Sequence, residues 1–274
     1  MYLHNQIHYF ITALAMNCIF KDGRDLVQML ERTLPFLHEA NLEFTEDGLI
    51  MHSIDSTHIV LVDNCLRLSC FESYTIDKGK FGLDIYNVLR ILRHYIPASE
   101  RSQVSLSIEG EELKLSVQRL DGSMVHTILP SSTLDTETWG IPAYTPDSTV
   151  TFTQSTYKIV CEELKNVVGP VLISCDSKQA CFEGTALSHS NDNDVKRIQC
   201  MTKPRDGALE CLRILSLKEY DGYFGDHLLQ KLCPAEDSYD LIYFKFTNDM
   251  PLCVEYPIGV DGYVRIYIAP TEDC

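Results

Sequence analysis

The sequence predicts an α+β protein made of two similar halves, each with antiparallel sheets and two helices. Three observations lead to this prediction. Short β-prone runs are joined by Asp-Gly or Glu-Gly turns, which is typical of antiparallel hairpins. The order strand, helix, strands, helix, strands occurs twice, over about 125 residues each time. A segment rich in Pro, Ser and Thr, residues 130–144, separates the two occurrences.

In the first half, two helices are predicted where apolar residues recur at helical spacing. The first covers residues 25–34, and Pro35 ends or kinks it. The second follows residues 81–84, with an apolar stripe on one side and Arg90, Arg93 and His94 on the other. Strands are predicted at residues 18–20, 42–44, 49–54, 59–62, 66–71, 104–108, 113–118 and 124–129.

The second half repeats this plan after the Pro-rich segment. Helices are predicted at residues 155–166 and 225–232, and residues 188–194 form a polar loop. Strands are predicted at residues 148–152, 171–175, 179–185, 196–201, 209–217, 240–246, 252–257 and 263–269.

Composition excludes several classes of protein. With 274 residues, 45% hydrophobic and 23% charged, the chain has an ordinary globular composition. A net charge of −16 argues against a surface that binds nucleic acid throughout, although it permits a local basic face. Eleven cysteines without a C-x-x-C pair favour reduced thiols in a cytosolic or nuclear compartment. No stretch approaches the length of a membrane span. The apolar run at residues 9–16 follows no Lys or Arg, so a secretory signal is not expected.

A polar turn interrupts the apolar residues 49–62. Asp55, Ser56 and Thr57 carry short oxygen-bearing side chains that can hold a tight turn between two strands. With His58 they supply a carboxylate, hydroxyls and an imidazole, but neighbouring residues diverge and do not converge as a catalytic triad must. Phosphate-binding, dinucleotide-binding, zinc-protease and hydrolase motifs are absent from the sequence. A binding protein without cofactor or metal is therefore expected, and catalysis by Asp55 and His58 is the alternative from another class.

Five segments, in order, resemble those of one family. Residues 49–62 (Leu-Ile-Met-His-Ser-Ile-Asp-Ser-Thr-His-Ile-Val-Leu-Val) resemble the "Ser-Met-Asp-Ser-Ser-His" segment of eukaryotic-type DNA sliding clamps, the proliferating cell nuclear antigen family. The likeness runs from about Met16 to Pro270. The other segments that resemble this family are residues 81–93, 140–142, 171–175, and 250–256 with 267–270.

The resemblance implies a DNA-clamp fold in which three copies close a ring of six domains. It divides the chain into an N-terminal extension (1–15), a first clamp domain (16–130), an interdomain connector (131–144) and a second clamp domain (145–274). Such a ring encircles double-stranded DNA without sequence preference, is opened by a clamp loader, and tethers DNA polymerase and other replication and repair proteins. It has no enzymatic activity and no membrane partner. The expected location is the nucleus, or a cytoplasmic replication site if the source is viral.

The resemblance also implies a pocket that takes a short apolar and aromatic docking motif. Trp139, the only tryptophan, departs from the aliphatic residue usual in the family, so it narrows the pocket or adds a stacking face. The matching positions are Ile54, His58, Ile59, Leu61, Trp139, Ile141, Pro142, Met250, Pro251, Ala269 and Pro270.

DNA contact in such a ring is electrostatic and should use basic residues on the helices. Ring closure by edge-strand pairing is expected at residues 123–130 and 195–202. Val27, Gln28, Glu31, Glu162 and Glu163 make the helices less basic than the family norm. The expected DNA-facing residues are Arg24, Arg90, Arg93, Lys158, Lys165 and Lys231.

Because the helices carry fewer basic residues than is usual in the family, a second interpretation remains open. The chain could be a subunit of a heterotrimeric checkpoint clamp, or a clamp-like polymerase accessory protein that closes no ring. The intact pocket and carboxyl end favour the homotrimer instead. The oligomeric state discriminates between the two.

Overall fold

The computed structural model describes residues 17–75, 79–96, 102–109, 112–119, 121–129, 134, 140–141, 145–186, 195–204, 207–233, 240–248 and 250–271. The N-terminal extension, the polar loop at 188–194 and most of the connector lie outside these residues. Within them, no helix is long and apolar enough to cross a membrane.

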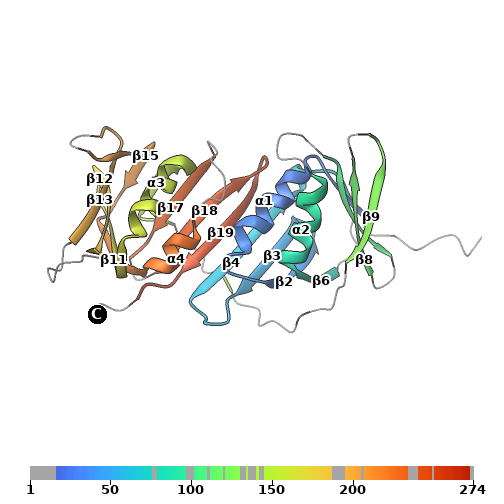
Figure 1. Ribbon diagram of the computed structural model, residues 1–274, viewed down its shortest axis with the longest axis horizontal. Helices are drawn as coiled ribbons and strands as arrows, with labels where there is room; N and C mark the ends of the chain where they lie inside the picture. The colour runs from blue at the N-terminus through green and yellow to red at the C-terminus, as the bar shows by residue number, and fades with distance from the viewer. Residues whose placement is uncertain are drawn as a thin grey trace, which may run out of the picture.

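The described strands form three sheets, with four α-helices packed on them (Figure 1). A five-stranded sheet has the order β5 (Phe71–Thr75), β1 (Asn17–Phe20), β7 (Val104–Glu109), β8 (Glu112–Gln118), β9 (Met124–Leu129). A central nine-stranded sheet has the order β15 (Arg213–Ser216), β10 (Ser148–Thr153), β17 (Leu241–Phe246), β18 (Leu252–Ile258), β19 (Gly262–Ile268), β4 (Val60–Arg67), β3 (Gly48–Ile54), β2 (Glu39–Thr45), β6 (Gly79–Asp84). The third sheet has the order β14 (Leu209–Glu210), β13 (Val195–Met201), β12 (Gln179–Ala186), β11 (Val167–Cys175), β16 (Tyr220–Gly225).

The duplicated plan predicted from the sequence is present in this topology. The order β5-β1-β7-β8-β9 recurs as β15-β10-β17-β18-β19, and the order β6-β2-β3-β4 recurs as β16-β11-β12-β13. The two halves join where β19 pairs antiparallel with β4, from Tyr263 opposite Cys65 to Ile268 opposite Val60. The central sheet therefore combines five strands of the second half with four of the first.

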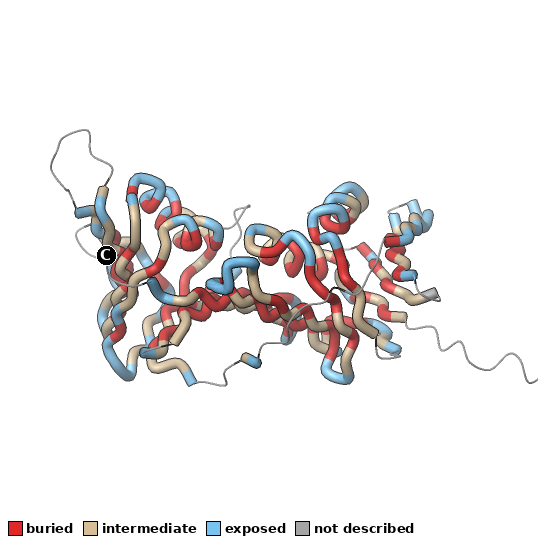
Figure 2. The backbone as a smooth tube through the Cα atoms, turned by 90° about the horizontal axis from the view of Figure 1, so that it is seen from below, coloured by how far each residue is buried: buried red, intermediate tan, exposed pale blue. Residues whose placement is uncertain are grey.

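The helices lie on one face of the central sheet (Figure 2). They are α1 (Gly23–Thr33), α2 (Ile85–Tyr95), α3 (Gln154–Leu164) and the short α4 (Asp226–Lys231). Their apolar stripes are buried, as the helical spacing predicts, with Leu26, Met29 and Leu30 of α1 essentially inaccessible. Asp22 caps α1 through the Arg24 amide, which starts the helix two residues earlier than predicted.

Two predicted strands are wrong as continuous elements. Residues 66–71 contain the end of β4, a 3₁₀ turn (Leu68–Cys70) and the start of β5. Residues 209–217 contain β14 and β15, with a break at Cys211 and Leu212. In both places the chain leaves one sheet for another. At the first break, Leu66 and Phe71 are buried on either side, so the apolar pattern continues across it and hides it. At the second break, only Cys211 is buried, and the apolar residues Leu212, Leu215 and Leu217 are exposed although they resemble a core strand in the sequence.

Three strands were not predicted as strands: β5, β6 and β16. The sequence of β6, Gly-Lys-Phe-Gly-Leu-Asp, carries two glycines, and that of β16 carries Asp221, Gly222 and Gly225. Glycine and aspartate have low strand propensity. These strands lie at sheet edges, where pairing with one neighbour (β2 or β11) is enough to fix an extended chain.

Candidate docking site

Asp55 organises the turn between β3 and β4. Its carboxylate accepts hydrogen bonds from the amides of Ile59 (2.9 Å) and Val60 (2.7 Å) and from the amide and hydroxyl of Thr57. Partial burial raises the pKa of Asp55, but these hydrogen bonds outweigh it and hold the pKa below its ordinary value. The carboxylate is therefore committed to the turn, which argues against a role as a catalytic base.

His58 completes the turn in a left-handed backbone conformation. Its φ is 59°, and it is the one non-glycine residue with positive φ in the described part of the chain. The His58 amide donates to the Asp55 carbonyl (3.0 Å), and the Asp55 amide donates to the Val60 carbonyl (2.8 Å). This reversal exposes the imidazole and the Ile59 side chain just before the start of β4.

A small apolar pocket of about 140 Å³ lies beside this turn. Strand pairing assembles it, because Leu61 of β4 stands opposite Ile54 of β3 and Tyr267 of β19. The amide of Ala269 donates to the Ile59 carbonyl (3.0 Å), which ties the segment after β19 to the turn. The lining residues are Ile54, His58, Ile59, Leu61, Pro251, Tyr267 and Ala269.

Six of the positions expected from the sequence line this pocket, and Tyr267 is an additional one. The sequence could have revealed Tyr267, because it lies two residues before Ala269 and alternate residues of a strand point to the same face. Met250 and Ile141 are half-buried and Pro270 is exposed, and they do not line the pocket. Trp139 and Pro142 lie outside the described residues.

The chemistry of the pocket suits an apolar ligand. Burial raises the pKa of the Tyr267 phenol above its ordinary value, so this side chain is neutral at physiological pH. The remaining lining is aliphatic except for the imidazole at the rim. Such a site favours one aromatic or aliphatic anchor with few polar contacts.

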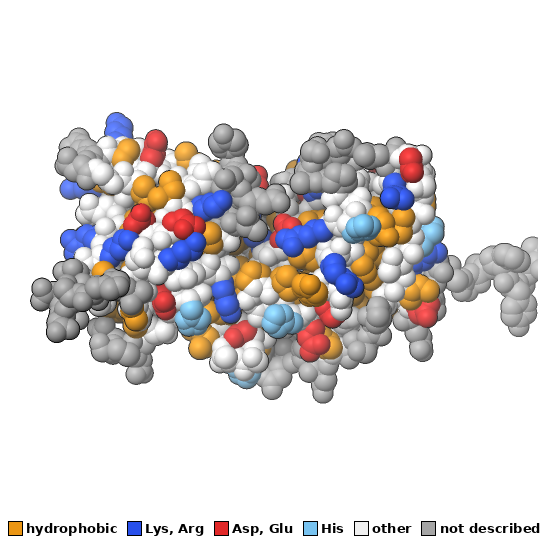
Figure 3. Space-filling view, viewed as in Figure 1, with side chains coloured by type: hydrophobic (Ala, Val, Ile, Leu, Met, Phe, Trp, Pro, Cys, Tyr) orange, Lys and Arg blue, Asp and Glu red, His pale blue; other side chains and the backbone are white. Residues whose placement is uncertain are grey.

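The expected DNA-facing residues lie on or beside the helices, where acidic side chains accompany them (Figure 3). Arg93 of α2 pairs with Glu31 of α1 (2.7 Å), and Lys165 pairs with Glu162 (2.7 Å). Arg24 pairs with its own helix cap, Asp22 (2.5 Å). These ion pairs reduce the net positive charge that the helix face offers to a phosphate backbone.

The other three basic residues have different surroundings. Arg90 is exposed on α2, and Lys158 is half-buried on α3. The Lys231 Nζ lies 5.8 Å from the centre of the Phe36 ring, across the boundary between the halves. The helix face thus mixes both signs of charge.

Two strand edges correspond to the segments expected to join subunits. Among the described strands, β9 pairs only with β8, and β13 pairs with β14 only at Cys200 and Met201. Apolar side chains are exposed on both edges: Met124 and Ile128 on β9, and Val195 on β13. Each edge therefore offers free backbone hydrogen-bonding groups beside apolar surface.

Within the described residues, no group of three or more His, Cys, Asp or Glu side chains is arranged to hold a metal ion. Asp55 and His58 both take part in the hydrogen bonds of the β3–β4 turn described above.

Comparison with known proteins identifies the fold. Residues 16–119 match the family described as proliferating cell nuclear antigen, N-terminal domain. The structure is similar to that of PCNA from Thermococcus kodakaraensis, with a TM-score of 0.80 and 20% sequence identity over 93% of this chain and 100% of that chain. It is also similar to a chain of the PCNA2–PCNA3 complex from Sulfolobus tokodaii, with a TM-score of 0.78 and 16% identity over 93% and 99% of the two chains.

Proposed function

We propose that this chain is a DNA polymerase processivity factor, because residues 16–119 match the proliferating cell nuclear antigen family and 93% of the chain aligns with the structure of a PCNA clamp. It forms a sliding clamp of three identical subunits that encircles duplex DNA and docks replication and repair proteins. It acts as a scaffold without enzymatic activity. Its place of action is the nucleus, or a cytoplasmic replication site if the source is viral.

The strongest support for the proposed ring is the topology of the sheets. Inside the chain, the last strand of the second half, β19, pairs with β4 of the first half. Of the strands in the same two positions of the repeated plan, β9 has no second partner in the described residues, and β13 has only the two-residue strand β14, at Cys200 and Met201. Pairing β9 of one subunit with β13 of the next would repeat the internal junction between subunits. Such head-to-tail pairing closes a ring if the rotation is suitable.

The pocket supports docking of partner proteins. It lies at the end of three adjacent strands and is small, apolar and open beside an exposed Ile59. A short peptide with an aromatic or aliphatic anchor would bury that side chain against Leu61 and Tyr267. The polymerase, which brings such a motif, would then remain with the ring as it moves on DNA.

A second function, that of a checkpoint-clamp subunit or a polymerase accessory protein without a ring, draws on the charge distribution. Three of the basic residues expected to face DNA are held in ion pairs with acidic neighbours. The net charge of −16 per chain also gives no long-range attraction to DNA, which favours this second function. If the chain does form the homotrimeric ring, a clamp loader would have to bring that ring onto DNA.

Light scattering of the purified protein over a range of concentrations tests the ring. Three copies of the 31.2-kDa chain in a stable particle are the expected result. A monomer at every concentration would contradict the homotrimer and favour the accessory protein. Assembly only with a different clamp chain would favour the checkpoint-type subunit.

The docking pocket is tested with a short peptide that carries an aromatic anchor, measured by calorimetry. Ile59→Ala should weaken binding by at least about 1 kcal/mol, because it removes one wall of the pocket. Ile59 is 40% exposed, so this change should leave the fold intact. Val260→Ala is the matched control, since Val260 is an apolar residue 75% exposed in the β18–β19 turn. Equal affinities for the two variants would contradict this pocket.

The enzymatic alternative makes a different prediction for the turn. If Asp55 and His58 were catalytic, the double change to Asn and Ala would abolish a chemical activity. As a scaffold, the variant loses only peptide affinity and turn stability.

A further inference from the structure

A buried asparagine on the outer face of the central sheet holds one residue of the connector. Asn41 of β2 donates from Nδ2 to the Leu134 carbonyl (2.9 Å) and accepts at Oδ1 from the Leu134 amide (3.0 Å). One side chain therefore satisfies both backbone groups of Leu134. Among side chains, only the amides of Asn and Gln offer a donor and an acceptor in this arrangement.

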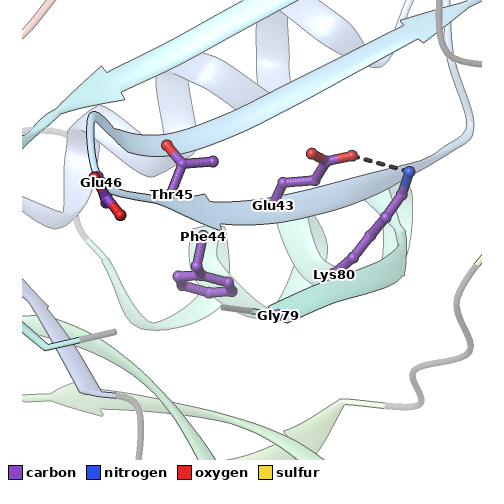
Figure 4. A pocket seen from close by; sticks show the side chains of 6 residues that line it. All are labelled: Glu43, Phe44, Thr45, Glu46, Gly79 and Lys80. Atoms are coloured by element: carbon purple, nitrogen blue, oxygen red, sulfur yellow. Dashed lines mark ion pairs between the residues drawn. The ribbon is translucent and has the colours of Figure 1, made fainter. Parts of the chain in front are cut away.

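The position of Asn41 on its strand shows which face it occupies. Ala40, Leu42 and Phe44 point to the core beneath the helices. Glu43 and Thr45 project from the opposite side of β2 to Phe44 (Figure 4). Because side chains alternate along a strand, Asn41 shares the face of Glu43, away from the helices.

Asn41 is nevertheless only 1% exposed, although Glu43 on the same face is half-buried. Its cross-strand neighbour is Gly82 of the edge strand β6, which brings no side chain to cover it. Gly82 is buried as well. The hydrogen-bonded Leu134 accounts for part of this cover, and the glycine leaves room for a backbone to approach the sheet closely.

We propose that Asn41 is a positioning residue that fastens the chain to the outer face of the central sheet at Leu134 and thereby limits where Ile141, farther along the same segment, lies relative to the docking pocket. This inference rests on the docking function proposed above. Leu134 lies between the end of β9 at Leu129 and the start of β10 at Ser148. From Leu134, Ile141 is seven residues away along the chain, a reach of at most about 25 Å. A fixed position for Leu134 narrows the positions open to Ile141, which lowers the entropic cost of any contact between Ile141 and a docking peptide.

The native protein offers a first test that needs no variant. In hydrogen exchange, the Leu134 amide should exchange at least tenfold more slowly than an unprotected amide, because Asn41 Oδ1 accepts its hydrogen bond. Exchange at the unprotected rate would overturn the proposal.

Variants of Asn41 give the second test, with Trp139 as the reporter because it is the only tryptophan and lies five residues after Leu134. Asn41→Leu keeps the shape and removes both hydrogen bonds, and Asn41→Asp keeps the acceptor and removes the donor. Both should lower the fluorescence anisotropy of Trp139 and increase its quenching by acrylamide, without any peptide present. Both should also weaken binding of the docking peptide about three- to tenfold.

Asn64→Ala is the matched control. Asn64 is another fully buried asparagine, on β4, whose amide donates to the Thr33 hydroxyl of α1 (2.7 Å) inside the core. Its replacement should lower the melting temperature but leave Trp139 quenching and peptide affinity unchanged. If the Asn41 variants behave like this control, Asn41 is a structural residue only and the proposal fails. A wild-type protein that binds no peptide would contradict the docking function, while the exchange and Trp139 measurements would still decide the role of Asn41.

Discussion

At the scale of single residues, the turn after β3 depends on Asp55. Asp55→Ala leaves the amides of Ile59 and Val60 without their acceptor, so it should lower the free energy of unfolding by about 1–3 kcal/mol. Chemical denaturation measures this change. The same variant should weaken peptide docking, since Ile59 forms part of the pocket.

The loss of unfolding free energy in Asp55→Ala should become smaller at acidic pH. Because hydrogen bonding holds the pKa of Asp55 below its ordinary 3.8, its contribution is present above that pH and disappears as the pH falls through the lowered pKa. The stabilities of wild type and Asp55→Ala should therefore converge only below about pH 4. Asp47→Ala, at an exposed position in the neighbouring β2–β3 turn, serves as the control and should change stability by less than about 0.5 kcal/mol. A difference between Asp55→Ala and wild type that stays constant down to pH 2 would contradict this account.

Single residues also show where sequence reasoning is limited. Ile54, His58 and Ile59 could be assigned to one pocket because they are close in sequence and match a recognisable segment. The ion pair of Arg93 with Glu31 could not, because these residues are 62 positions apart and the sequence does not show that the two helices lie side by side. The Asn41 contact spans 93 positions of the chain and leaves no local pattern.

At the scale of elements, the proposed trimer assembles through the edges of β9 and β13. Ile128→Glu places a charge on an apolar side chain that is 57% exposed on β9, so it should dissociate the trimer to monomers without unfolding them. Light scattering together with circular dichroism measures both effects.

The edge strand β15 supplies the control for this prediction. Leu215, 48% exposed, lies on β15, an edge strand of the central sheet outside the proposed subunit interface, and Leu215→Glu should leave the trimer intact. Dissociation by Leu215→Glu, with an intact trimer for Ile128→Glu, would show that subunits join at β15 instead.

Elements with strong periodicity could be predicted from the sequence, and elements at sheet changes could not. Helices α1 and α2 have clear apolar stripes and polar caps, so their positions follow from local sequence. The division of residues 66–71 between two sheets depends on which neighbours β4 and β5 find, β3 and β19 in one case and β1 in the other. Those neighbours are distant in sequence, and the pairing is decided by tertiary packing.

At the scale of the whole molecule, the excess of acidic residues should weaken the proposed binding of DNA. Glu31→Gln and Glu162→Gln together release Arg93 and Lys165 from their ion pairs on the helix face. The double variant should bind a short duplex more tightly at low salt. The slope of log affinity against log salt should steepen by about 0.9 for each additional phosphate that the helix face neutralises. Fluorescence anisotropy of a labelled duplex at several salt concentrations measures this slope.

Glu43→Gln is the control because Glu43 pairs with Lys80 (2.9 Å) on the outer face of the central sheet, away from the helices. It changes the net charge by one unit but should not change the salt slope. If it steepens the slope as much as the helix-face variant does, DNA binding follows total charge and the helix face is not the binding surface.

The nine-stranded sheet has a mechanical consequence for a ring of such subunits. Strand pairing continues without interruption from β15 to β6, so the two halves of a subunit are joined rigidly and bend little relative to each other. Separating β19 from β4 would break one ladder and also stretch a covalent connector anchored at Leu134. Separating β9 from the β13 of a neighbouring subunit would break a ladder alone. In the proposed ring, elastic strain would therefore concentrate at the joints between chains, and a gap that admits DNA would open there.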